Sequence, residues 1–143
     1  MENIQFDSGV VRYQLNGGGV LQFNPGDPNV YARFSQAMEK IEAVEQWLTQ
    51  QAKAEEQELA LVCLMAEADG KIKKILDWVF GQGNDFDKAL GGVNLLAVAG
   101  NGNRVVENLL SALEPVLVAG AEACVSQKAR EAVQKAEARR ANQ

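Results

Sequence analysis

Apolar and polar residues alternate between residues 3 and 24. The apolar positions are Ile4, Phe6, Val11, Tyr13, Leu15, Leu21 and Phe23. A repeat of two is typical of β-strands with one buried face. The segment Asn16-Gly17-Gly18-Gly19 interrupts the alternation, and Asn-Gly at such a position is a strong hairpin signal. We therefore predict an antiparallel ribbon of two or three strands in residues 1–26, which must pack on helices or pair with another chain.

After residue 26 the apolar residues are three or four positions apart, which indicates helices. Asp27 is suited to cap the first helix, and Pro28 is suited to its first position. Its apolar face consists of Tyr31, Phe34, Met38, Ile41, Val44 and Leu48. A second helix is predicted from about residue 58 to residue 80. Trp78 lies among apolar neighbours in that helix, and we expect it in the core.

Residues 81–103 are rich in glycine and asparagine, with two short apolar pieces between them. Because those pieces need burial, we predict a structured connection with one helical turn. Asp85 and Asp87 lie either on opposite sides of an extended segment or at a helix N-terminus that Asp85 caps. A last helix should start near Asn103, and Pro115 should kink it or end its first part. Residues 126–143 carry five basic and two acidic side chains on a mostly alanine background. This segment is either an exposed helix or disordered until bound.

Together these elements predict a mainly α fold of the α+β type. A small N-terminal antiparallel β-ribbon in residues 1–26 precedes a bundle of three to four helices. The helical domain covers residues 27–125 and includes the Gly/Asn-rich connection 81–103. A basic, alanine-rich tail follows in residues 126–143.

The amino-acid composition excludes several classes of function. The 143 residues include no histidine and only two cysteines, which removes His-based acid–base catalysis and most zinc sites. The formal net charge of −5 argues against a general nucleic-acid-binding surface. Cys63 and Cys124 lie in apolar surroundings, and we expect buried free thiols. No signal peptide and no uncharged run long enough for a membrane span are recognisable. We predict a cytoplasmic protein that is not an enzyme and uses neither metal nor cofactor.

Short motifs add no chemistry to this prediction. Asp69-Gly70-Lys71 is similar to part of a calcium loop, but Met65 and Leu76 would stand where acidic ligands belong. The glycines at 17–19 have no following Lys-Ser/Thr, so they do not form a phosphate-binding loop. Trp47 lies beside Leu48 at the edge of a helix face, where it would be either core rim or the anchor for a partner.

The order of elements and several short motifs carry a family resemblance. The stretch from Phe23 to Phe34 opens a long helix, and Leu76-Asp77-Trp78-Val79-Phe80-Gly81 closes the next one. Asn84-Asp85-Phe86 and Gly92-Val93-Asn94-Leu95-Leu96 follow, and the last helix ends in Ala138-Arg139-Arg140-Ala141. This layout resembles the tail assembly chaperones of phages and prophages, in particular siphophages that infect Gram-positive bacteria.

The resemblance implies a non-enzymatic chaperone in the host cell cytoplasm. The resemblance implies that the chain binds the tape measure protein and the tail tube protein during tail morphogenesis. We expect a client or self-association groove on the apolar faces of residues 31–48 and 105–117. The candidate partner-binding residues are Tyr31, Phe34, Trp47, Leu48, Leu109 and Leu113. We predict no nucleic-acid or membrane partner, and self-association into a homo-oligomer stays open.

Two other functions remain open. The chain could be a structural tail or connector component of the virion, whose β-ribbon augments the sheet of a neighbour. It could also be a small phage regulatory protein that binds a ligand in a pocket. That pocket would need convergent polar groups, and the Gly/Asn segment 81–103 is the part of the sequence that could supply them.

Overall fold

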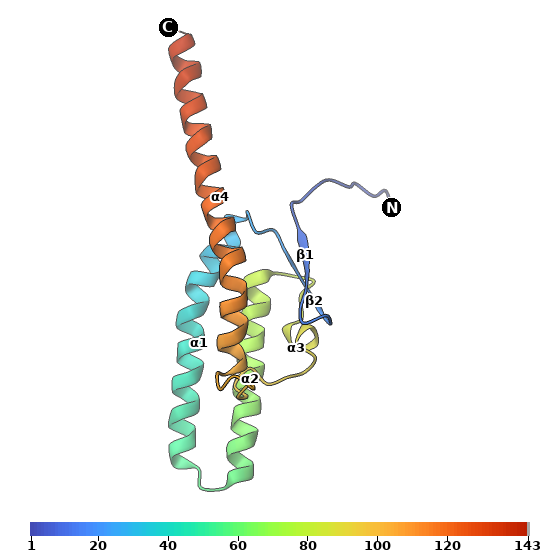
Figure 1. The fold of residues 1–143 in the computed structure, drawn as a ribbon, viewed down its shortest axis with the longest axis vertical. Coiled ribbons are helices and arrows are strands. Elements are labelled where there is room, and N and C mark those ends of the chain that lie inside the picture. The colour runs from blue at the N-terminus through green and yellow to red at the C-terminus, as the bar shows by residue number, and fades with distance from the viewer. Residues whose placement is uncertain (143) are drawn as a thin grey trace.

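In the computed structural model, which describes residues 1–142, a two-stranded ribbon precedes four helices (Figure 1). The elements are β1 (Val11–Gln14), β2 (Val20–Phe23), α1 (Pro28–Ala54), α2 (Glu58–Phe80), α3 (Phe86–Ala89) and α4 (Val105–Ala141). The predicted fold, mainly helical with a small N-terminal antiparallel ribbon, is confirmed. The short helix α3 is the single helical turn expected between residues 81 and 103.

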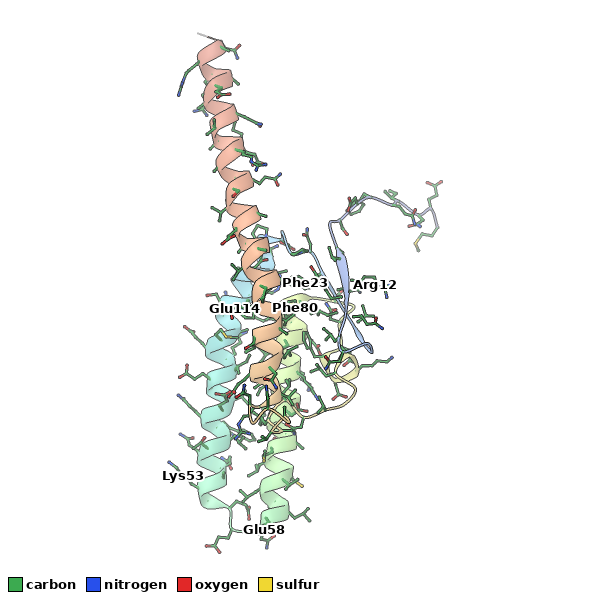
Figure 2. All side chains as sticks on the ribbon, viewed as in Figure 1. Arg12, Phe23, Lys53, Glu58, Phe80 and Glu114 are labelled. Carbon is green, nitrogen blue, oxygen red and sulfur yellow. The ribbon has the colours of Figure 1, made fainter. Side chains whose placement is uncertain are left out.

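The ribbon is a hairpin of β1 and β2, with Val11 opposite Phe23 and Tyr13 opposite Leu21. Its turn contains Asn16 and Gly17 with φ of 50° and 69°, a conformation that Asn and Gly adopt most readily. The aromatic ring of Phe23 then reaches Phe80 at the end of α2, with ring centroids 4.9 Å apart (Figure 2). The ribbon is thereby packed on the helices, as a two-stranded sheet of this size requires.

No third strand joins the ribbon among residues 1–10. Ile4 and Phe6 alternate with polar residues, but they are 86% and 81% exposed and belong to no strand. Alternation alone does not make a strand, because the backbone also needs a neighbouring strand to pair with. The first ten residues therefore form an extended arm with four exposed apolar side chains, Met1, Ile4, Phe6 and Val10.

Helices α1 and α2 form a long antiparallel hairpin. The Asp27 carboxylate accepts a hydrogen bond from the Asn29 amide at 2.9 Å, and Pro28 begins α1, so the predicted cap is confirmed. The inward faces of the two helices supply much of the core. Its buried members on the two helices are Val30, Ala37, Ile41, Ala68, Ile72, Leu76, Val79 and Phe80. The link between the helices is only residues 55–57, so α1 runs through most of the polar stretch after residue 50.

Three side chains expected in the core lie elsewhere. Trp78 is 40% exposed, because helical geometry turns it away from the face that carries Leu76 and Val79. Cys63 is exposed and Cys124 is half-buried, and both are free thiols. Apolar neighbours in the sequence do not bury a helical residue, since adjacent positions point about 100° apart.

A buried ion pair fastens the connection 81–104 to α2. The Lys73 ammonium lies 2.8 Å from the Asp69 carboxylate and 2.7 Å from that of Asp87, and it donates to the Val93 carbonyl at 2.8 Å. Burial lowers the pKa of this ammonium. The hydrogen bonds and charges of Asp69 and Asp87 outweigh that effect, and the pKa of Lys73 is raised above 10.5. Asp69 also accepts the Leu95 amide at 2.8 Å.

A second tether runs from the same connection to the ribbon. The Asn84 side-chain oxygen accepts the Gln22 amide, and its side-chain nitrogen donates to the Gln22 carbonyl, both at 2.8 Å. The Asp77 carboxylate receives the Phe86 amide at 2.8 Å, and burial raises the pKa of that carboxyl. Asp85 caps α3 through the Lys88 amide, which is one of the two arrangements that the sequence left open. The glycine-rich segment is thus held by side chains at both ends.

Helix α4 packs on the hairpin along its first half only. Val106, Leu109, Leu113 and Leu117 are buried, whereas most residues after 120 are exposed. The helix continues through Pro115, so the prediction that the proline could end it is wrong. Pro115 and Ser111, whose carbonyl loses its helical donor, both face solvent, and water can satisfy that carbonyl.

The second half of α4 extends beyond the rest of the molecule. Gly120 is closely packed, since a side chain there would overlap the Pro25 carbonyl and the Tyr31 hydroxyl, and half-buried Cys124 lies beside Tyr31 one turn later. Residues 126–141 are helical and mostly exposed. By length and apolar composition α4 meets the criteria for a membrane span, with 11% of the qualifying window buried, and a single helix of this kind is weak evidence for one.

Candidate helix-binding groove

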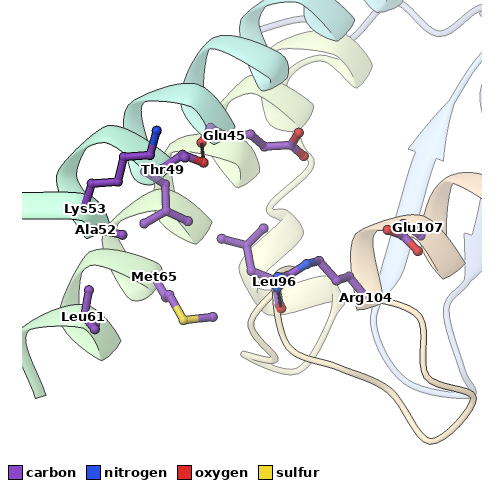
Figure 3. Close-up of a pocket in the computed structure, with 10 residues that line it drawn as sticks. Glu45, Thr49, Ala52, Lys53, Leu61, Met65, Leu96, Arg104 and Glu107 are labelled. Atoms are coloured by element: carbon purple, nitrogen blue, oxygen red, sulfur yellow. Dashed lines mark hydrogen bonds between the residues drawn. The ribbon is translucent and has the colours of Figure 1, made fainter. Parts of the chain in front are cut away.

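The α1–α2 hairpin is longer than the part of it that α4 covers. Helix α4 starts at Val105, part of the way along the hairpin, and runs away from the hairpin tip (Figure 1). Between the two long helices and the start of α4 lies a hollow of about 680 Å³ (Figure 3), which we call the hairpin-tip hollow. Its lining residues are Glu45, Leu48, Thr49, Ala52, Lys53, Leu61, Met65, Leu96, Arg104 and Glu107.

The hollow has an apolar floor and a charged rim. Leu48, Leu61, Met65 and Leu96 are half-buried or buried, while the rim residues Thr49, Lys53 and Glu107 are exposed, so the hollow opens to solvent. Methionine adapts its shape to different partners, which makes Met65 a suitable floor residue for a protein ligand.

The wall nearest α4 is fixed by the connection. The Arg104 guanidinium donates to the Leu96 carbonyl, and the Val106 amide donates to the Leu95 carbonyl at 2.8 Å. The Asn94 side chain reaches the Met65 carbonyl on α2 at 3.3 Å. These bonds hold Leu96 in place as the inner end of the hollow, so this end of the site is formed before any ligand arrives.

Of the six predicted partner-binding residues, Leu48 is the one that lines this hollow. Leu109 and Leu113 are 9% and 6% exposed, and both are part of the core. Tyr31 lies at the other end of α1, where its hydroxyl donates to the Pro25 carbonyl, and Phe34 packs against the core one turn later. Burial, followed by the neighbouring Cys124 and Tyr13, raises the pKa of Tyr31.

Trp47 does not line the hollow. The Lys71 ammonium of α2 lies 3.4 Å from the centroid of its ring, a cation–π contact across the hairpin. A second contact of the same kind joins Lys40 of α1 to Trp78 of α2 at 3.8 Å. Each tryptophan therefore has one ring face covered by a lysine of the opposite helix.

The polar side chains of residues 81–103 serve the fold. Asn84 bonds to Gln22 and Asp87 bonds to Lys73. The Asn94 side chain donates to the Met65 carbonyl of α2 and accepts from the Leu96 amide. They point into separate tethers and do not converge on one cavity. Among residues 1–142, moreover, no three acidic or cysteine side chains come close enough together to hold a metal ion.

Sequence reasoning missed the floor of the hollow. Leu61, Met65 and Leu96 come from two separate segments, and only the position at which α4 begins exposes them together. The spacing of Leu61 and Met65 by four residues was the available signal, since it places both side chains on one face of α2. No protein-family model, curated protein or solved structure matches this chain.

Proposed function

We propose that this chain is a non-enzymatic assembly protein that binds an amphipathic helix of a partner in the hairpin-tip hollow. One observation carries the proposal: two long helices lie side by side without a third helix over their tip, and the uncovered groove has an apolar floor. Helical ligands commonly bind in such grooves through residues spaced three and four apart. A hollow of this volume accommodates several side chains of one helix face.

The resemblance to tail assembly chaperones supplies the candidate client. In this proposal the groove holds a helical segment of a phage tape measure protein in the host cytoplasm while tail tube subunits assemble. The apolar floor would cover client residues that otherwise aggregate.

Co-expression with a tape measure protein, followed by affinity purification and sizing, tests the proposal. We expect the client to stay soluble and to co-elute only when this chain is present. Leu61→Lys places a charge on the floor of the hollow and should weaken binding at least about tenfold, or about 1.4 kcal/mol. Val62→Lys is the matched control, because the next residue on the helix is exposed and does not line the hollow.

Two results would reject this function. The first is a client that neither binds nor gains solubility. The second is equal loss of binding in the Leu61 and Val62 variants, which would move the binding surface away from the hollow. Circular dichroism of both variants checks that each retains its helices.

A structural role in the virion is the second candidate, because β1 has a free outer edge and the arm of residues 1–10 is bare. Both features fit strand addition between neighbouring subunits. Mass spectrometry of purified virions separates the two functions. A chaperone should be missing from finished particles, whereas a tail component should be present in fixed stoichiometry.

A further inference from the structure

The free half of α4 lacks a packing partner in the molecule. Residues 125–141, which we call the tail helix, extend roughly 25 Å past Cys124, the half-buried neighbour of Tyr31. Its Val125 and Val133 are 70% and 56% exposed. Helices of this length are marginal in water without tertiary contacts, so a covering surface would stabilise this one.

At the opposite end of the molecule, the hairpin tip has an uncovered groove, whereas the tail helix lacks a surface to pack on. The hairpin tip has two helices and no third, and the missing third helix would continue the line of α4 beyond Val105 (Figure 1). Lys53 and Glu58 mark this tip, which lies far from the C-terminus (Figure 2). The uncovered part of the hairpin is roughly two turns long, judged from α1 after Leu48 and α2 before Met65.

Charge distinguishes the two ends. Residues 42–67 of the hairpin carry six acidic side chains and one basic side chain, whereas residues 126–141 of the tail helix carry five basic and two acidic ones. The lining of the hollow is balanced, with Glu45 and Glu107 against Lys53 and Arg104, so the acidic excess lies on the parts of the hairpin outside that lining. Opposite charges of this kind steer encounter and fix register.

The shape of the tail helix fits the same groove. Four small or β-branched residues lie on one face, and they are Ala129, Ala132, Val133 and Ala136. Small side chains allow close approach between helices, and the valine can enter the hollow over Leu61 and Met65. This stripe spans about two turns, which is close to the uncovered length of the hairpin.

We propose that the tail helix of one copy docks in the hairpin-tip hollow of a second copy, in line with the α4 helix of that copy. The contact is heterologous, so copies associate head to tail into open chains or closed rings. An interface of about two helical turns is small, and we expect a dissociation constant on the order of micromolar. Screening should weaken it as salt is raised.

Charge-swapped variants of the full chain test this directly, because the proposal needs no client. The tail-reversed variant carries Lys135→Glu, Arg139→Glu and Arg140→Glu. The hairpin-reversed variant carries Glu45→Lys, Glu56→Lys and Glu58→Lys. In analytical ultracentrifugation at low salt, wild type should associate with concentration, each variant alone should associate at least about tenfold more weakly, and an equimolar mixture should regain association.

Three outcomes overturn the proposal. The first is wild type that stays monomeric up to the highest soluble concentration. The second is a mixture that associates no better than its parts. The third is a hairpin-reversed variant that associates as wild type does, which would mean that tails pair with tails. Client binding by the tail-reversed variant tests the proposed function separately, because its hollow is unchanged.

Discussion

The Lys73 ion pair gives the sharpest test of how the connection 81–104 is held. Lys73→Met keeps most of the volume of the side chain and removes its charge. The substitution leaves the Asp69 carboxylate, whose side chain is 13% exposed, without its cation. It also leaves the Val93 carbonyl without its donor. Two consequences follow: the connection loosens, and the whole fold loses stability.

The size of the effect follows from the burial of each partner. Removing one member of a buried ion pair costs about 3–5 kcal/mol. The Asp87 side chain is 66% exposed, so its pairing with Lys73 adds little. Asp69 keeps its hydrogen bond from the Leu95 amide, which offsets part of the loss. We therefore expect Lys73→Met to lower the free energy of unfolding by about 3 kcal/mol, or Tm by roughly 10 °C.

Urea denaturation followed by circular dichroism measures this loss, and Lys74→Met is the matched control. Lys74 is the next residue on α2 and is exposed, so its replacement should change stability by less than about 0.5 kcal/mol. Asp69→Asn in the Lys73→Met background removes the uncompensated charge and should restore part of the stability. Equal stability of the Lys73 and Lys74 variants, or simple additivity in the double-mutant cycle, would refute the reasoning.

Two further predictions concern glycines and pH. Gly120→Ala should destabilise the protein by about 1–3 kcal/mol, because the added methyl group overlaps the Pro25 carbonyl. Gly70→Ala should stabilise the protein by about 1 kcal/mol, because a methyl group there meets no other atom. Thermal melts compare the two variants, and equal shifts in Tm would contradict the packing around Gly120. Because the pKa of Lys73 is raised on folding, its contribution to stability is complete below pH 10.5 and is lost as pH rises through the folded pKa. Wild type should therefore lose stability more steeply than Lys73→Met in alkaline urea titrations, and parallel curves would contradict the assigned shift.

Local chemistry made much of the fold predictable. The bounds of α2, the cap at Asp27 and the turn at Asn16-Gly17 depend on residues close together in the sequence. The Asp69–Lys73 pair had the same kind of signal, since a spacing of four on a helix brings opposite charges together. Its third member, Asp87, comes from the connection, and only the folded chain brings it to Lys73.

The errors share one physical cause, which is the orientation of a side chain relative to distant elements. Trp78 and Cys63 have apolar neighbours in the sequence, yet their helical positions face outward. Ile4 and Phe6 alternate as strand residues do, but no strand lies beside them. The hairpin-tip hollow is the most important feature that the sequence did not predict. It depends on where α4 begins along the α1–α2 hairpin, and the sequences of α1 and α2 do not specify that position.

The Asn84 side chain makes the ribbon asymmetric toward other polypeptides. Its amide group bonds to both the amide and the carbonyl of Gln22, the two backbone groups that a neighbouring strand would use there. The outer edge of β2 is therefore closed at its centre, and β1 is left as the edge where a strand can add. A sheet with one closed edge can pair with a single incoming strand, at its open edge. It cannot take up an interior position in a larger sheet, because that position needs two open edges. Asn84 thus leaves the ribbon one edge for strand addition, at β1.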